Sequence, residues 1–209
     1  METTFTHTFL YELVTLFVIL DPVATVPIFL AATVGLTRKQ SLLVAAYAVS
    51  IAFGVLLFFI VGGQILLNSL HIAMPSFQLA GSIVLLLFGL KMVLGKVTEE
   101  AASIPAGASL LERSIYPLAM PGIAGAGAML TVVLLTDNNV RSLKEQLLTT
   151  AELVLCLVVL FCIYAMSGLL FRLLGRVGIE IISRVFGLIL ASIAVNGLVT
   201  AIKLSFGLA

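Results

Sequence analysis

Residues 9–33 read FLYELVTLFVILDPVATVPIFLAAT, and Asp21 and Pro22 lie near the middle of this apolar stretch. It is long enough for a helix to cross a bilayer, which takes about 20 apolar residues. An acid followed by a helix breaker would place an ionisable side chain and freed backbone polar groups where hydrocarbon satisfies neither. The stretch therefore predicts a spanning helix interrupted near its centre, with the break in a packed or water-lined cavity. We interpret the break as the first half of a substrate site.

The composition agrees with a membrane protein. Of the 209 residues, 61% are hydrophobic and 10% are charged, whereas soluble domains have roughly 25% charged residues. Lipid is the solvent that tolerates this deficit. The net charge of +1 and the lack of a Lys/Arg cluster give no basis for binding nucleic acid.

Hydropathy predicts an all-α polytopic protein with six transmembrane helices. The first three occupy a half made of residues 1–95, the last three occupy a half made of residues 114–209, and a polar connecting loop covers 96–113. The expected spans are Phe9–Thr33, Ser41–Leu67, Pro75–Gly95, Ser114–Thr136, Leu147–Phe171 and Ile181–Phe206.

The basic residues predict the orientation in the membrane. With the N-terminus outside, eight of the eleven Lys and Arg residues face the cytoplasm, as the positive-inside tendency favours. We therefore expect a multi-pass protein of the cell membrane with both termini external. The eight residues are Arg38, Lys39, Lys91, Lys96, Arg113, Arg172, Arg176 and Arg184.

The two halves share features at corresponding positions. Pro22 in the first span matches Pro121 in the fourth, and residues 77–81 (FQLAG) resemble residues 183–187 (SRVFG). A duplicated unit with three spans must place its second copy upside down in the membrane. Inverted repeats with paired interrupted helices are typical of secondary transporters, so helices 1 and 4 are expected to be interrupted.

In the first break, Asp21 is predicted to be the N-cap of a new half-helix, with Pro22 at its first helical position. The free N–H groups of such a half-helix suit a carboxylate, and the carbonyls that end the preceding half suit an ammonium or a cation. Three roles for Asp21 stay open: a cap only, a contact to substrate directly or through water, or a group protonated during transport.

The second break is expected at residues 120–128, which read MPGIAGAGA. Gly122, Gly125 and Gly127 would free the backbone to unwind and let a ligand approach it closely, and Thr131 follows one turn later. Close helix packing through small residues is the alternative. The match with the first break favours a binding loop.

Other polar residues are weaker candidates. Asn196 in span six and Gln78 in span three would line the cavity or form interhelical hydrogen bonds. Glu12 and Glu152 are expected near span ends, within reach of water. The sequence has no HExxH, Gly-x-Ser-Gly or Walker A motif, so we expect no enzyme activity, no metal and no cofactor.

With these segments in place, the chain resembles the MarC family of bacterial and archaeal inner-membrane proteins. Residues 21–27 (DPVATVP) are similar to the family's Asp-Pro-x-Gly-Asn-x-Pro, and residues 121–128 (PGIAGAGA) to its Pro-x-x-x-Gly-Pro-Gly-Ala. Residues 183–191 fit as well. Ala24, Thr25 and Ala126 replace the expected Gly, Asn and Pro. Thr25 lacks the amide's two N–H donors, and Ala126 removes a rigid breaker.

The resemblance implies six spans in two inverted repeats that move small neutral amino acids such as glycine, alanine and serine. The substrate carboxylate would bind N–H groups near Thr25 and Gly125–Gly127, and its ammonium would meet carbonyls or Asp21, while Thr131 adds a hydroxyl. A proton or a sodium ion is the expected coupling partner. An ion or metal permease and a non-transporting membrane regulator are the alternatives.

Overall fold

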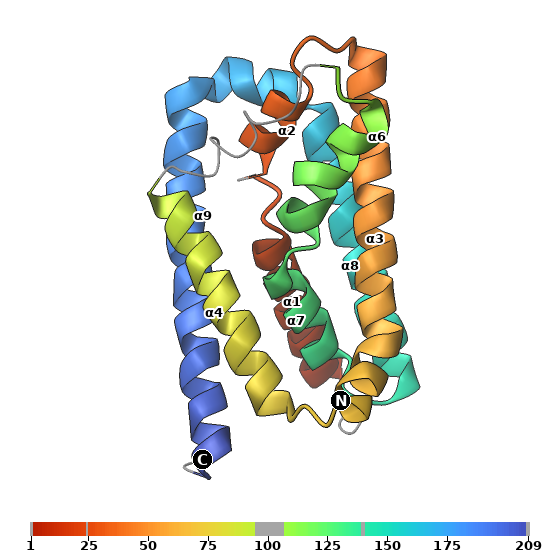
Figure 1. Cartoon of the computed structure of the whole chain (residues 1–209), viewed down its shortest axis with the longest axis vertical. Coiled ribbons are helices and arrows are strands. Elements are labelled where there is room, and N and C mark those ends of the chain that lie inside the picture. The colour runs from red at the N-terminus through yellow and green to blue at the C-terminus, as the bar shows by residue number, and fades with distance from the viewer. Residues whose placement is uncertain (1, 24, 95–106, 139–140, 208–209) are drawn as a thin grey trace.

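The structure is a computed structural model that describes residues 2–23, 25–94, 107–138 and 141–207. Every regular element in these residues is a helix, and the helices form one elongated bundle (Figure 1). The beginning of α1 and the end of α9 lie at the same end of the bundle. We call this end the terminal end. Which side of the membrane it faces stays a prediction.

The first half contains α1 (Glu2–Leu20), α2 (Val26–Ala32), α3 (Arg38–Ser69) and α4 (Met74–Val93). The second contains α6 (Leu110–Arg113), η1 (Ser114–Ile123), α7 (Ala126–Leu135), α8 (Leu143–Ala165) and α9 (Ser167–Phe206). Residues 96–106 of the predicted connecting loop lie outside the described residues. The rest of that loop includes α6, which begins with a capping box between Ser109 and Glu112.

Corresponding helices begin with corresponding signals. A capping box between Thr37 and Gln40 starts α3, and one between Ser142 and Glu145 starts α8. These are the second long helix of the first half and its counterpart in the second half. The correspondence between the two halves stays a prediction, because α6 also begins with a capping box.

Among the described residues, four helices are long and apolar enough to cross a membrane: α3, α4, α8 and residues 177–206 of α9. A fifth crossing is the bent pair formed by residues 110–123 and α7. The predicted first span is divided into α1 and α2, and its apolar helical part, Phe9–Leu20, is too short to count by itself. The structure thus supports four to five of the six predicted crossings.

The predicted fifth span ends earlier than expected. It was placed at Leu147–Phe171, but α8 ends at Ala165. The first part of α9 runs across the end of the bundle opposite the terminal end, and the chain then turns along the bundle (Figure 1). Gly175 makes this turn with a φ of 64°, a conformation that glycine adopts readily. Hydropathy does not detect the change of direction between α8 and α9, because apolar residues continue after Ala165.

Helices of the two halves pack on one another throughout the bundle. The α4–α9 contact is the most extensive, and α3 packs on α8, α1 on α7 and α2 on η1. At the α4–α9 crossing, a Cβ atom added to Gly89 would lie 2.9 Å from the Gly187 oxygen. The two backbones are therefore closer than any larger residue permits, as is typical of membrane helices.

The outer surface of the bundle is apolar. Large hydrophobic side chains such as Val61, Leu87, Val158 and Leu188 are more than half exposed. In water such a surface would drive association. In a membrane it is the surface that lipid chains cover, which leaves the buried polar residues as the candidates for function.

Candidate functional site

The first break lies between α1 and α2, and both of its polar residues are buried. Asp21 is 1% exposed and Thr25 is 2% exposed. Asp21 has a φ of 45°, and its N–H donates to the carbonyl of Phe17 at 3.1 Å. A residue in the left-handed region that donates four residues back is one of the standard ends of an α-helix. Asp21 therefore terminates α1.

The predicted capping role of Asp21 is wrong. Thr25, and not Asp21, is the N-cap of α2, and the first residues of α2 are Val26 and Pro27. Pro22 precedes the helix instead of starting it. The physical reason is the left-handed conformation of Asp21, which ends one helix and leaves four residues before the next one begins.

Thr25 holds the loop of the first break. Its hydroxyl donates to the carbonyls of Asp21 and Pro22, at 3.1 and 3.2 Å, and makes no capping bond to α2. The Asp21 carbonyl also accepts from the Thr25 N–H at 3.2 Å, so Thr25 binds the loop that follows α1 through both its backbone and its side chain. Ala24, where the family motif has glycine, lies outside the described residues.

The second break separates η1 from α7, whose helical segments meet at an angle of 56°. Tyr116 and Met120 have extended backbone conformations inside η1, each followed by a proline. Gly125 is the N-cap of α7. The interruption thus occurs within the predicted stretch, and its disturbed backbone begins a few residues earlier, at Tyr116.

The glycines of the second break allow its backbone to fold tightly on itself. A Cβ atom on Gly122 would lie 2.8 Å from the carbonyl oxygen of Pro117, and one on Gly125 would lie 2.6 Å from that of Pro121. A Cβ on Gly127 would collide with Leu85 of α4. Gly122 and Gly125 thus permit the loop to fold on itself, and only Gly127 contacts a neighbouring helix, which was the alternative interpretation of these glycines.

The two breaks lie close together in the bundle. A small cavity of about 60 Å³ is lined by Ile19 near the end of α1, by residues of α4, and by Pro121–Gly122–Ile123 and Gly125–Ala128 of the second break. The volume corresponds to a few water molecules. In addition, Nη1 of Arg113 donates to the carbonyl of Ala32 at 2.7 Å, which joins the end of α2 to the segment before η1.

A larger cavity of about 450 Å³ lies beside α2. Phe29 of α2 and Tyr164 of α8 both line it, and their rings stack with centroids 4.4 Å apart. Arg38 and Arg172 also line it. The Tyr164 hydroxyl lies near Asp21 and Thr25 but outside hydrogen-bonding geometry. The stacked pair thus contacts this cavity, and Tyr164 also lies near the first break.

The other predicted site residues lie at different depths of the bundle. Thr131 is 7% exposed, on α7 just after the second break. Gln78 is half-buried on α4, Asn196 is exposed on α9, and neither lines either cavity. Asp21 and Thr25 thus lie at the first break and the three glycines at the second, while Thr131, like Gln78 and Asn196, lines neither of these two cavities.

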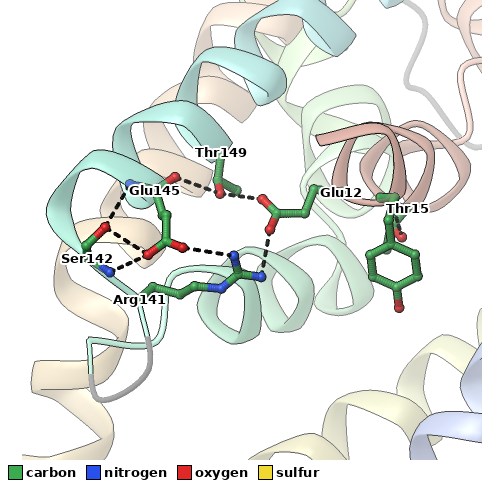
Figure 2. Close-up of polar contacts among 7 residues, drawn as sticks. Glu12, Thr15, Arg141, Ser142, Glu145 and Thr149 are labelled. Carbon is green, nitrogen blue, oxygen red and sulfur yellow. Dashed lines mark hydrogen bonds and ion pairs between the residues drawn. The ribbon is translucent and has the colours of Figure 1, made fainter. Parts of the chain in front are cut away.

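Glu12 and Glu152, which we expected near span ends within reach of water, are themselves buried. They are 2% and 1% exposed, respectively. Glu12 pairs with Arg141, whose Nη2 is 2.7 Å from Oε1, and accepts a hydrogen bond from the Thr149 hydroxyl at 2.8 Å (Figure 2). Tyr164, which lines the larger cavity, was not among the site residues predicted from the sequence. Four-residue spacing from Glu152 through Cys156 and Leu160 to Tyr164 makes a stripe that winds slowly around α8, a signal present in the sequence.

A metal centre finds no support in this geometry. Among the residues that the structure describes, no group of three His, Cys, Asp or Glu side chains is placed to hold a metal ion. The polar side chains described at the first break are the Asp21 carboxylate and the Thr25 hydroxyl.

Comparison with known proteins identifies the family. A family model described as MarC family integral membrane protein matches residues 6–206. The chain belongs to the MarC family. It is 30% identical to a UPF0056 membrane protein of Aquifex aeolicus (strain VF5), over 93% of this chain and 92% of the relative.

Two further relatives match almost as fully. Identity is 32% to the UPF0056 membrane protein MJ1677 of Methanocaldococcus jannaschii, over 93% of this chain and 96% of the relative. It is 29% to the UPF0056 inner membrane protein YhgN of Escherichia coli (strain K12), over 91% and 94%. No solved structure matches. This MarC family protein is thus an integral membrane protein, and the relatives' names state no substrate.

Proposed function

We propose that this MarC family protein is a secondary transporter of small neutral amino acids of the glycine, alanine and serine class. The observation that carries the proposal is the meeting of two interrupted helices inside the bundle, where the end of α1 and the second break border one cavity. Interrupted helices that face each other at mid-membrane form the substrate sites of many secondary transporters.

The chemistry of the two breaks matches the two ends of an amino acid. The start of α7 presents backbone N–H groups and the positive end of a helix dipole, which attract a carboxylate. Asp21 supplies the negative charge that an ammonium needs. The narrow cavity beside Gly125 and Gly127 leaves space for only a small side chain.

The proposed transport movement depends on an inverted-repeat relation between the two halves of the chain. Six crossings in two inverted repeats require α1 and α2 to count together as one broken span. The contacts between α4 and α9 and between α3 and α8 agree with this arrangement. Rocking of one repeat against the other would then open the breaks to each side in turn. The cavity beside Phe29 and Tyr164 is the proposed route to one side.

The test is counterflow of radiolabelled glycine, alanine and serine in liposomes that contain the purified protein. We expect flux above that of empty liposomes, strongly reduced in Asp21→Asn. Asn196→Ala is a matched control because Asn196 is exposed and away from the breaks. Wild-type flux equal to that of empty liposomes with all three substrates would refute the proposal.

An ion or metal permease is the second candidate, because Asp21 and free carbonyls also suit cations. It requires several converging oxygen ligands, and the described residues offer one carboxylate at the breaks. Flux of a cation without any amino acid in the same liposomes would favour it.

A regulator without transport activity would tolerate Leu at both Asp21 and Pro121 without loss of function.

A further inference from the structure

Glu152 is a buried carboxyl group that the proposed substrate site does not use. It lies on α8, which begins at Leu143, so its Cα is about 14 Å along the helix at 1.5 Å per residue. It is 1% exposed, and neither carboxylate oxygen has a hydrogen-bond partner among the described residues.

Its neighbours on α8 show where the side chain points. Thr149, one turn before it, donates to Glu12 of α1 at 2.8 Å. Cys156, one turn after it, has its Sγ 3.8 Å from the carbonyl oxygen of Leu13 of α1. Residues three and four apart share a helix face. Glu152 therefore faces α1 between these two contacts, next to Glu12.

The charges around Glu152 are unbalanced when it is ionised. Glu12 and Arg141 form an ion pair that is neutral by itself. An ionised Glu152 would add an uncompensated negative charge beside Glu12, in a place from which water is excluded. Such a charge is costly, so the neutral acid has the lower free energy there. Neither α3 nor α7, which also pack on α8, carries a charged residue near this level.

The site has a connection to water. The Arg141 side chain is 23% exposed and reaches Glu145, which is 48% exposed, at 3.8 Å. Figure 2 shows Arg141 between Glu12 and Glu145. Arg141 can balance only one of Glu12 and Glu152 at a time, because a movement toward Glu152 would leave Glu12 with only its hydrogen bond from Thr149. The cluster is therefore neutral only when one of the two glutamates holds a proton.

We propose that Glu152 is a proton-binding site that couples proton movement to substrate movement. The proposal rests on the transport function above. A proton from water at the terminal end converts the Glu152 carboxylate to the carboxylic acid, and the same proton returns to water on the other side after the helices rearrange.

α1 is the element that connects the two sites. It carries Glu12 at the α8 contact and ends at Asp21, nine residues or about 14 Å further on. The buried core of the bundle includes apolar residues of both helices, such as Leu16 of α1 and Leu160 of α8, which carry no proton. Coupling therefore acts through a shift of α1 against α8, and not by proton transfer from Glu152 to Asp21.

A direct test measures proton binding without transport. Infrared difference spectra of the purified protein, recorded while the pH is raised, should show the loss of a carboxylic acid band. We expect Glu152→Gln to lack this band. Glu180→Gln, at an exposed pair with Arg184 on α9, should retain it. Glu152→Asp should show a displaced band, which keeps the assignment testable if the Gln variant folds poorly. An unchanged band in Glu152→Gln would overturn the proposal.

The transport test uses the same variants in liposomes. A pH gradient of one unit should drive about tenfold accumulation of labelled alanine by the wild type, for one proton per substrate. In Glu152→Gln this accumulation should be lost, while counterflow stays within about twofold of the wild type. Accumulation that persists in Glu152→Gln, or that needs a sodium gradient, would overturn the coupling role. Absence of any wild-type flux would refute the transport function, and the infrared result would still decide whether Glu152 binds a proton.

Discussion

The two breaks of this MarC family protein are stabilised by different means. In the first, Asp21 ends α1 in a left-handed conformation, and the Thr25 hydroxyl donates to the carbonyls of Asp21 and Pro22. In the second, the backbone folds on itself around glycines that have no space for a side chain. A side chain of the first break can therefore be substituted without moving the backbone, whereas an atom added to a glycine of the second break displaces the backbone.

The largest effect is expected in the second break. Gly125→Ala places a Cβ 2.6 Å from the carbonyl oxygen of Pro121, and overpacking of this kind costs about 1–3 kcal/mol. Thermal unfolding in detergent should show the loss. Gly54→Ala on α3 is the matched control, since nothing lies within 4 Å of its new Cβ. Equal stability of the two variants would contradict the tight fold of the second break.

In the first break, Asp21→Asn should change function more than stability. Asn tolerates the left-handed conformation as Asp does, so the end of α1 is kept while the negative charge is removed. Hydrogen bonds to charged groups contribute about 1.5–3 kcal/mol, so flux should fall at least roughly tenfold. Counterflow and thermal unfolding of the same preparation measure both effects. A variant that transports normally would leave Asp21 as a helix end only.

A smaller effect is expected for Thr25→Val. The change removes the hydroxyl that donates to the Asp21 and Pro22 carbonyls and keeps the volume of the side chain. Stability should fall by about 1 kcal/mol, the usual contribution of such a bond. Thr25→Ser retains the hydroxyl and should stay closer to the wild type in the same unfolding measurement. If Val and Ser behave alike, the hydroxyl does not hold the break.

The smallest effect is expected for Tyr164→Phe. The stacked contact with Phe29 is kept, and the hydroxyl that is lost has no hydrogen-bond partner in the described part of the chain. Stability should change by less than about 0.5 kcal/mol. Tyr164→Leu, which removes the stacking, should cost about 0.5–1.5 kcal/mol more. A large loss for Tyr164→Phe would show that the hydroxyl supports the first break through Asp21 or Thr25.

The sequence alone predicted the membrane class, the positions of both interruptions and the family. These features follow from apolar length and from proline and glycine, whose backbone effects are local. The end of span five was wrong because apolar residues continue after α8 ends at Ala165, and hydropathy does not detect the change of direction between α8 and α9. The role of Asp21 was wrong because an Asp can end a helix as well as begin one.

The tertiary structure decided which polar residues are buried together. Arg141 and Thr149 are more than a hundred residues from Glu12 in sequence, and no local pattern relates them. Asn196 is exposed although it lies in the middle of an apolar helix. Hydropathy reports how apolar a segment is, but the face that each residue presents, and the helix that it meets, depend on packing between distant segments. The sequence thus located the breaks, and the fold showed what surrounds them.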